Sequence, residues 1–269
     1  MLETTTHPEL TPVAVAAANY PSLEGRNVII TGGGSGIGMY LVEAFSRQGA
    51  RVGFIDIDEA NAQRVVDLIA PEVAFAPRFE IADLRDIDAL QASIEALRAQ
   101  LGPVHTLVNN AGNDDRMPAE EVTPQAWDDR MAVNLRHYFF AAQALLPDLA
   151  AQQGAIINMG SNSWMQGAPG MIAYTTAKSA IQGLTRSLAR EVGTRHIRVN
   201  SIAPGWILTD RQVSRAKAQD PDRLTTFLDR QCLREHLLPP DVARMTLFLS
   251  ADDSRLITGQ TFVVDGGVV

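Results

Sequence analysis

The fold is decided by the stretch Thr31-Gly32-Gly33-Gly34-Ser35-Gly36-Ile37-Gly38. An apolar, β-branched run at 27–31 precedes it directly, and an amphipathic run at 37–48 follows it. Glycine lets a backbone turn sharply and approach a ligand closely, and the free N–H groups at a helix start attract negative charge. The order strand, glycine turn, helix therefore predicts a site for a pyrophosphate.

Outward from this stretch, short β-branched runs alternate with longer amphipathic segments, as in repeated βαβ units. The expected strands are 27–31, 51–56, 73–81, 104–109, 155–160, 197–202 and 261–264. The expected helices are 37–48, 59–70, 87–101, 124–150, 171–192 and 241–250. Because parallel strands need crossover helices of this length, we predict a single-domain α/β fold. It is a doubly wound, Rossmann-like sheet of about seven parallel strands with helices on both faces.

The composition excludes several classes of protein. The 269 residues are 46% hydrophobic and 20% charged, which is ordinary for a soluble globular domain. The single cysteine, Cys232, rules out an intramolecular disulfide and a thiolate zinc cluster, and it favours a reducing compartment, so we expect a cytoplasmic protein without a metal. The net charge of -8 argues against a nucleic-acid partner. Of 23 basic residues only Lys178 and Lys217 are lysines, so a lysine here is not expected to be ordinary surface charge, although Lys217 could still be one.

Three segments differ in expected role. Residues 1–21 lack the features of an export signal or a membrane span, and we expect a flexible N-terminal extension. Residues 22–269 are expected to form one domain, which contains the predicted pyrophosphate site. Within it, 208–238 breaks the βα rhythm and is rich in Arg, Asp and Gln, so it is either a lid over the site or a solvated surface insertion.

Asp56 gives the first prediction about the ligand. It ends the second expected strand, 24 positions after Gly32. A carboxylate there can accept hydrogen bonds from both ribose hydroxyls of an adenosine and would repel a 2′-phosphate, so NAD is favoured over NADP. The glycine stretch contains no Lys or Arg, which supports the same choice and excludes a P-loop.

Other polar residues follow the third and fourth expected strands. Asp83 and Leu84 come after one, and Asn110, Ala111 and Gly112 come after the other. Each could simply form a turn. Ligands of doubly wound sheets bind outside the carboxyl ends of the strands, so these loops are expected to converge on the crevice near the glycine stretch.

Four residues could carry acid–base chemistry. Tyr174 and Lys178 are four positions apart on an expected helix and share one face. A nearby ammonium stabilises a phenolate and makes tyrosine a usable base. Ser161 follows the fifth expected strand, where its hydroxyl could hold a substrate oxygen. Asn134 lies inside the long helix 124–150, either as a tolerated polar residue or as the holder of a water.

With these residues in this order, the chain resembles the classical short-chain dehydrogenase/reductase family from about residue 22 to the end. We therefore expect residues 22–269 to be one NAD-binding catalytic domain. The resemblance also covers Asn200 before Pro204-Gly205, and Thr209. It implies an Asn134-Ser161-Tyr174-Lys178 tetrad, in which Tyr174 is the acid/base and Lys178 binds the nicotinamide ribose. Asn134 would hold a proton-relay water. It further implies cofactor contacts and a homotetramer; the contacts are Gly32, Ser35, Gly36, Ile37, Gly38, Asp56, Asp83, Leu84, Asn110, Ala111, Gly112, Tyr174, Lys178, Pro204, Gly205, Ile207 and Thr209.

Three strings carry a narrower resemblance, to bacterial NAD-dependent aldose 1-dehydrogenases of the D-xylose type. They are V-N-N-A-G-N-D-D-R at 108–116, V-N-L-R-H at 133–137 and Q-C-L at 231–233. This resemblance implies oxidation of the anomeric carbon of a sugar such as D-xylose, L-arabinose, D-galactose or L-fucose to a lactone. The expected substrate contacts are Asn113, Asp114, Ser163, Trp164, Trp206 and Arg211, although each could equally be a turn or a packing residue.

Other functions stay open at this point. One scaffold hosts many oxidoreductases, so a 3-oxoacyl reductase, a polyol dehydrogenase or another secondary-alcohol dehydrogenase is the alternative. A catalytically silent dinucleotide sensor is disfavoured because all four tetrad residues are present. For each of these enzyme functions the expected partner is a small-molecule substrate, and neither a nucleic acid nor a membrane is expected.

Overall fold

The structure, a computed structural model, describes residues 18–220 and 222–269. The strands are β1 (Asn27–Thr31), β2 (Arg51–Asp56), β3 (Arg78–Ile81), β4 (Thr106–Asn109), β5 (Ala155–Met159), β6 (Arg198–Pro204) and β7 (Thr261–Val264). The helices are α1 (Gly36–Arg47), α2 (Glu59–Ile69), α3 (Ile87–Leu101), α4 (Pro124–Met131), α5 (His137–Ala151), α6 (Ile172–Val192), α7 (Asp210–Gln219), α8 (Arg223–Leu228) and α9 (Pro239–Ser250).

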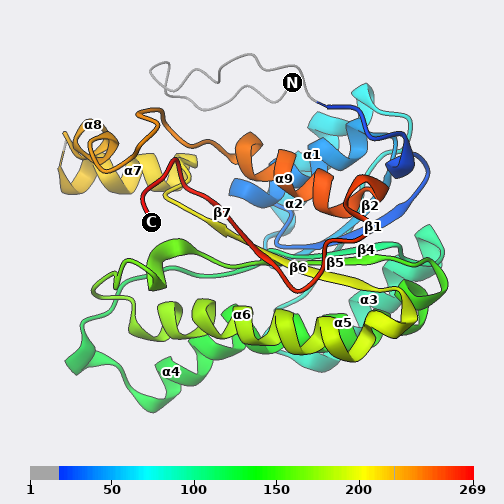
Figure 1. The fold of residues 1–269 in the computed structure, drawn as a ribbon, viewed down its shortest axis with the longest axis horizontal. Coiled ribbons are helices and arrows are strands. Elements are labelled where there is room, and N and C mark those ends of the chain that lie inside the picture. The colour runs from blue at the N-terminus through cyan, green and yellow to red at the C-terminus, as the bar shows by residue number, and fades with distance from the viewer. Residues whose placement is uncertain (1–17, 221) are drawn as a thin grey trace.

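The described residues form one seven-stranded sheet in the order β3-β2-β1-β4-β5-β6-β7, and every neighbouring pair is parallel. Figure 1 shows α1, α2 and α9 on one face and α3, α5 and α6 on the other. The predicted doubly wound α/β fold is confirmed. The strand order reverses between β1 and β4, and this is where such sheets bind ligands.

Two apolar cores hold the layers together. One joins Leu41 and Phe45 of α1, Val65 of α2 and Leu247 of α9 to the sheet. The other joins α3, α5 and α6 to the opposite face. The strands of the sheet centre are buried on both faces, which explains why their sequences are continuous apolar runs without alternation.

Two expected elements are corrected, whereas the other boundaries agree within two residues. The third strand begins at Arg78 and not at residue 73, because Pro77 has no N–H to give to a neighbouring strand. Phe75 instead lies under the guanidinium of Arg51, with 4.7 Å from Cζ to the ring centroid. The single helix expected over 124–150 is divided into α4, a π-helical turn (Ala132–Arg136) and α5.

The expected N-terminal extension, 1–21, lies almost wholly outside the described residues. Where the description begins, the Tyr20 amide donates to Oε1 of Gln48 at 2.8 Å, and Leu23 is fully buried. No described helix has the length and apolar character that a membrane crossing would require.

Asp148 fastens α5 to α3. Its carboxylate accepts hydrogen bonds from Nε and Nη2 of Arg98, at 2.8 and 2.7 Å, and from the Val104 amide at 3.0 Å. Burial alone would raise the pKa of Asp148, but these three donors outweigh it and lower the pKa from its ordinary value. The charged carboxylate therefore stabilises the fold, and this contribution is lost as the pH falls through the lowered pKa.

We expect Asp148→Asn to lower the free energy of unfolding by about 1–3 kcal/mol at pH 7, since charged hydrogen bonds are replaced by neutral ones. Below about pH 4 this carboxylate is protonated first in the unfolded chain and then, at the lowered pKa, in the folded protein, so the difference in stability between wild type and variant should narrow. Urea denaturation at several pH values measures both effects. Glu95→Gln is the matched control, because Glu95 binds the same arginine from an exposed position. If Asp148→Asn and Glu95→Gln lowered the free energy of unfolding equally, the stabilising role of the Asp148 carboxylate would be contradicted.

Candidate active site

A cavity of about 1520 Å³ opens at the carboxyl ends of the central strands. Its wall contains a residue at or just after six strands: Gly32 for β1, Asp56 for β2, Ala82 for β3, Asn110 for β4, Gly160 for β5 and Pro204 for β6. The convergence expected from the sequence is therefore present, at the point where the strand order reverses.

The glycine loop is packed too tightly for side chains. A Cβ on Gly38 would lie 1.7 Å from the carbonyl oxygen of Gly32, and Gly32 itself has a φ of +70°. Asn110 closes the loop from the other side, because its Nδ2 donates to the Gly32 oxygen at 2.9 Å. Because the loop carries no side chains at these positions, a ligand can approach its backbone closely.

The N-terminus of α1 differs from those of α2, α3, α4 and α7. The side chains of Asp58, Asp86, Thr123 and Thr209 cap α2, α3, α4 and α7, whereas Ser35 makes no such bond at α1. The first N–H groups of a helix have no partner within it. At α1 they face the cavity and can receive an anion, so the chain fits the pyrophosphate of a nicotinamide dinucleotide.

Asp56 lies beside this loop. Its carboxylate accepts the backbone N–H groups of Gly34 at 2.7 Å, Ile57 at 2.8 Å and Asp58 at 3.1 Å. Further along the same wall, Asp83 is bound by Arg85 at 2.6 Å, and this bond keeps the pKa of Asp83 below its ordinary value although burial opposes it. Leu84 is buried next to it.

The opposite wall carries the expected reactive groups. Ser161 follows β5, and Tyr174 and Lys178 lie one turn apart on α6. Lys178 is almost fully buried, and its Nζ donates to the hydroxyl of Tyr138 at 2.9 Å and to the Met159 oxygen at 2.8 Å. Nζ lies 5.6 Å from the centre of the Tyr174 ring. An ammonium has three donors, so one is left for a group in the cavity.

Burial shifts both titrating groups toward their neutral forms. It raises the pKa of Tyr174 to about 12, although a hydrogen bond with Ser161 acts in the opposite direction. Burial also lowers the pKa of Lys178 to about 7, against a smaller upward effect of Asp114. A charge that enters the cavity can therefore change the protonation of Lys178 near neutral pH, and a positive charge would also lower the pKa of Tyr174.

Asn134 lies behind the cavity wall, in the π-helical turn. Its Oδ1 accepts the Asn113 amide at 2.9 Å, and its Nδ2 donates to the oxygens of Asn113 at 3.1 Å and Arg130 at 3.0 Å. Asn134 thus braces the loop after β4. A role in holding a water stays a prediction. Such turns insert an extra residue into a helix and often occur at functional sites.

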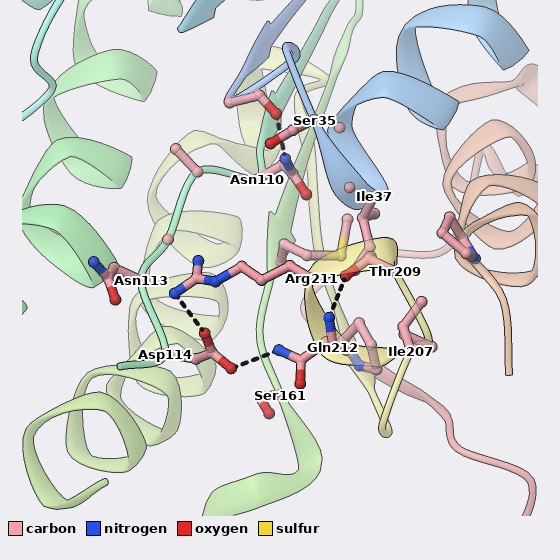
Figure 2. Close-up of a pocket in the computed structure, with 18 of the residues that line it drawn as sticks. Ser35, Ile37, Asn110, Asn113, Asp114, Ser161, Ile207, Thr209, Arg211 and Gln212 are labelled. Carbon is pink, nitrogen blue, oxygen red and sulfur yellow. Dashed lines mark hydrogen bonds and ion pairs between the residues drawn. The ribbon is translucent and has the colours of Figure 1, made fainter. Parts of the chain in front are cut away.

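Ionic contacts span the cavity mouth between the loop after β4 and α7. Asp114 accepts a hydrogen bond from Nη1 of Arg215 at 3.1 Å. It also accepts one from Nε2 of Gln212 at 2.7 Å and pairs with Arg211 at 3.6 Å (Figure 2). Asp115 pairs with Arg211 and, at 3.0 Å, with Arg215. The segment 208–238 therefore borders the site, and whether it moves as a lid stays a prediction.

A buried carboxylate supports the loop that carries Ser161. Asp265 accepts Nδ2 of Asn162 at 2.9 Å and the backbone amides of Gly267 at 2.8 Å and Val269 at 3.1 Å. Asp265 thus connects the backbone of Gly267 and Val269 to Asn162, the residue that follows Ser161.

Almost all residues expected at the site line the cavity. The exceptions are Asn134, which lies behind the wall, and Trp164. The latter is half-buried on the short 3₁₀ turn Asn162–Trp164, from which Asn162 and Ser163 but not the indole reach the cavity.

A family model described as enoyl-(acyl carrier protein) reductase matches residues 32–269. The chain belongs to the short-chain dehydrogenase/reductase family. It is therefore an oxidoreductase that acts on CH–OH groups with a nicotinamide dinucleotide, and the predicted family is confirmed.

Named relatives cover nearly the whole chain. A protein of Rhizobium meliloti (strain 1021) provisionally named galactose dehydrogenase GalD is 43% identical, over 95% of this chain and 100% of its own. A D-xylose 1-dehydrogenase of Caulobacter vibrioides (strain NA1000 / CB15N) is 42% identical, over 94% of this chain and 99% of its own. A crystal structure from Sinorhizobium meliloti 1021, assigned provisionally as a short-chain alcohol dehydrogenase, aligns with a TM-score of 0.86 and 31% identity, over 92% and 98% of the two chains.

Sequence reasoning missed several residues that build this dehydrogenase site. Tyr138 is fully buried, and its hydroxyl joins Lys178 to the Met159 oxygen, to which it donates at 3.0 Å. A signal was available, because Tyr138 lies one helical turn after Asn134. No local pattern marks Gln212, Arg215 or Asp265, which act through partners about 100 positions away.

The burial of Lys178 should lower the stability of the protein at neutral pH. The folded chain holds it with a pKa of about 7, whereas the ordinary value is 10.5. Between these values the unfolded chain binds more protons, so the penalty is complete below pH 7 and disappears as the pH rises toward 10.5. We expect Lys178→Met to raise the free energy of unfolding by about 1–3 kcal/mol at pH 6. This gain should shrink at alkaline pH.

Chemical denaturation at pH 6, 8 and 10 provides the measurement, with Lys217→Met on the exposed side of α7 as the matched control. A gain that is the same at pH 6 and pH 10 would show that the charge of Lys178 is not its cause.

Proposed function

We propose that the protein oxidises the anomeric hydroxyl of an aldose to a lactone, with NAD as the hydride acceptor. The observation that carries this proposal is the polar wall beside Ser161 and Tyr174. Asn113, Asp114 and Ser163 line it and present amide, carboxylate and hydroxyl groups to one space. A polyhydroxylated ligand needs such a set of donors and acceptors. The names of the two most similar relatives described above support the same substrate class.

In this proposal Ser161 and Tyr174 hold the hydroxyl oxygen of the sugar. In its phenolate form Tyr174 accepts the proton through Oη, and Lys178 lies close enough to stabilise that phenolate. A bound nicotinamide ring would supply the hydride acceptor and a positive charge in the cavity. Tyr138 and the Met159 oxygen fix the position of Lys178, and Asn134 fixes the loop that carries Asn113. The chain thus aligns the reacting groups and tunes the base.

The central test compares wild type with Tyr174→Phe in an assay of NADH absorbance. We expect wild type to oxidise aldoses in preference to polyols and to reduce acyl thioesters poorly. The variant should lose turnover by about a hundredfold or more, because general-base catalysis typically contributes 10²–10⁴-fold. It should retain dinucleotide binding, measured by fluorescence quenching. Tyr20→Phe, at the other end of the chain, is the matched control. Undiminished oxidation by Tyr174→Phe, or a preference for acyl thioesters, would contradict the proposal.

The choice of NAD rests on the position of Asp56 at the adenosine end of the cavity. A 2′-phosphate there would meet a carboxylate, and like charges in direct contact cost several kcal/mol. We expect Asp56→Ser to raise the ratio of catalytic efficiencies, NADP over NAD, by about tenfold or more. Asp58→Asn is the control, since it removes a charge two residues further on and keeps an amide oxygen to cap α2. Comparable efficiencies of wild type with the two cofactors would refute the argument.

We also propose the homotetramer that the family resemblance implies. Phe139 of α5 and Ile172 of α6 are 40% and 46% exposed, so these helices present apolar side chains to a neighbouring subunit. The expected cytoplasmic location stays a prediction.

A further inference from the structure

The substrate cavity contains an aromatic pair with a guanidinium over each ring. Trp206 and Phe227 meet edge to face, with 4.8 Å between their centroids. Arg223 lies over Trp206 at 5.7 Å and Arg230 over Phe227 at 5.3 Å, both from Cζ to the ring centroid. All four side chains line the cavity.

These two arginines differ from Arg211 and Arg215, the two arginines of α7 that line the same cavity. Arg211 and Arg215 are neutralised by Asp114 and Asp115, as described above. Among residues 18–220 and 222–269, neither Arg223 nor Arg230 has a carboxylate within ion-pair distance. Both positive charges are therefore uncompensated by the described chain, although the whole protein carries a net charge of -8.

Their hydrogen bonds go to neutral amides. Arg223 Nη1 donates to Oε1 of Gln219 at 2.5 Å, and Arg230 Nη2 donates to Oε1 of Gln166 at 2.8 Å. A guanidinium has five N–H donors in a planar fork, so each keeps donors for a further partner. Such a fork matches the geometry of a carboxylate or a phosphate.

Arg230 is also connected to the reactive end of the cavity. Its partner Gln166 donates to Oδ1 of Asn162 at 2.8 Å, and Asn162 directly follows Ser161. A ligand held by Ser161 and Tyr174 at one end can thus meet the aromatic pair and its guanidinium groups at the other.

We propose that Arg223 and Arg230 form an anion subsite that receives the carboxylate or phosphate of an acidic sugar. The inference rests on the proposed aldose oxidation and names its substrate class. The rings of Trp206 and Phe227 take the apolar face of the sugar, and they hold the guanidinium groups over them. A neutral aldose leaves both guanidinium groups without the partner for which their charge and shape are suited.

The test measures kcat/KM with D-galacturonate, D-galactose 6-phosphate and D-galactose, and it measures binding of the same three sugars by calorimetry. We expect an anionic sugar to exceed galactose by at least about tenfold, the value of one charge-assisted hydrogen bond. A preference for galacturonate identifies the anion as a carboxylate, and a preference for the 6-phosphate identifies it as a phosphate.

Arg223→Gln and Arg230→Gln, singly and together, should each reduce the ratio of anionic to neutral kcat/KM, and the double variant should abolish the preference. Arg→Lys at the same positions should restore part of it, since charge is retained without the planar fork. Arg234→Gln is the matched control, because Arg234 lies in the same segment, pairs with Asp229 at 3.2 Å and does not line the cavity. Thermal unfolding checks that each variant is folded.

The outcomes separate this inference from the proposed function. Oxidation of all three sugars with equal efficiency, or equal effects of Arg234→Gln and the double variant, overturns the subsite and leaves aldose oxidation in place. If no sugar is oxidised but an anionic sugar binds and the double variant loses that binding, the proposed function fails and the subsite stands. If neither anionic sugar binds more tightly than galactose, the subsite is refuted.

Discussion

The site depends on one costly interaction, the burial of a lysine ammonium between a tyrosine hydroxyl and a main-chain oxygen. Lys178 of α6 reaches across to Tyr138 of α5 and to the last residue of β5, so a single side chain fixes the spacing of three elements. The same burial favours the neutral forms of Tyr174 and Lys178, and it brings the pKa of Lys178 to about 7. Arginine could not replace it, since its broad planar fork differs from a compact ammonium that uses two donors here and offers a third.

Most of the fold and the position of the site could be predicted from the sequence, because local rules and global topology agree. A strand buried in a parallel sheet has a continuous apolar sequence, and a helix that covers the sheet has an amphipathic one. The carboxyl ends of parallel strands all lie at one edge of the sheet. Asp56, Asn110, Ser161 and Pro204 therefore had to lie near one another once the strands were recognised. The rarity of lysine also pointed to a functional role for Lys178, since the chain contains only two lysines.

What escaped prediction depends on contacts that no local pattern encodes. The π-helical turn at Asn134 adds one residue to an otherwise regular periodicity, and Pro77 shortens β3 although the apolar alternation continues before it. The bonds of Asp114 to α7 join residues about 100 positions apart. Trp164 looked like a ligand contact because of its position in the loop, but the short turn directs its neighbours and not its ring into the cavity.

The contact of Asn162 with Asp265 bears on the order in which parts of the site form during synthesis. It spans 103 positions, and the Val269 amide binds the same carboxylate. Chains emerge from the ribosome N-terminus first, so the strands up to β6 can begin to form before Asp265 has been added. The loop that carries Ser161 lacks its buried support until Asp265 has emerged. The sheet of a nascent chain can thus begin to form before the loop that carries Ser161 is braced.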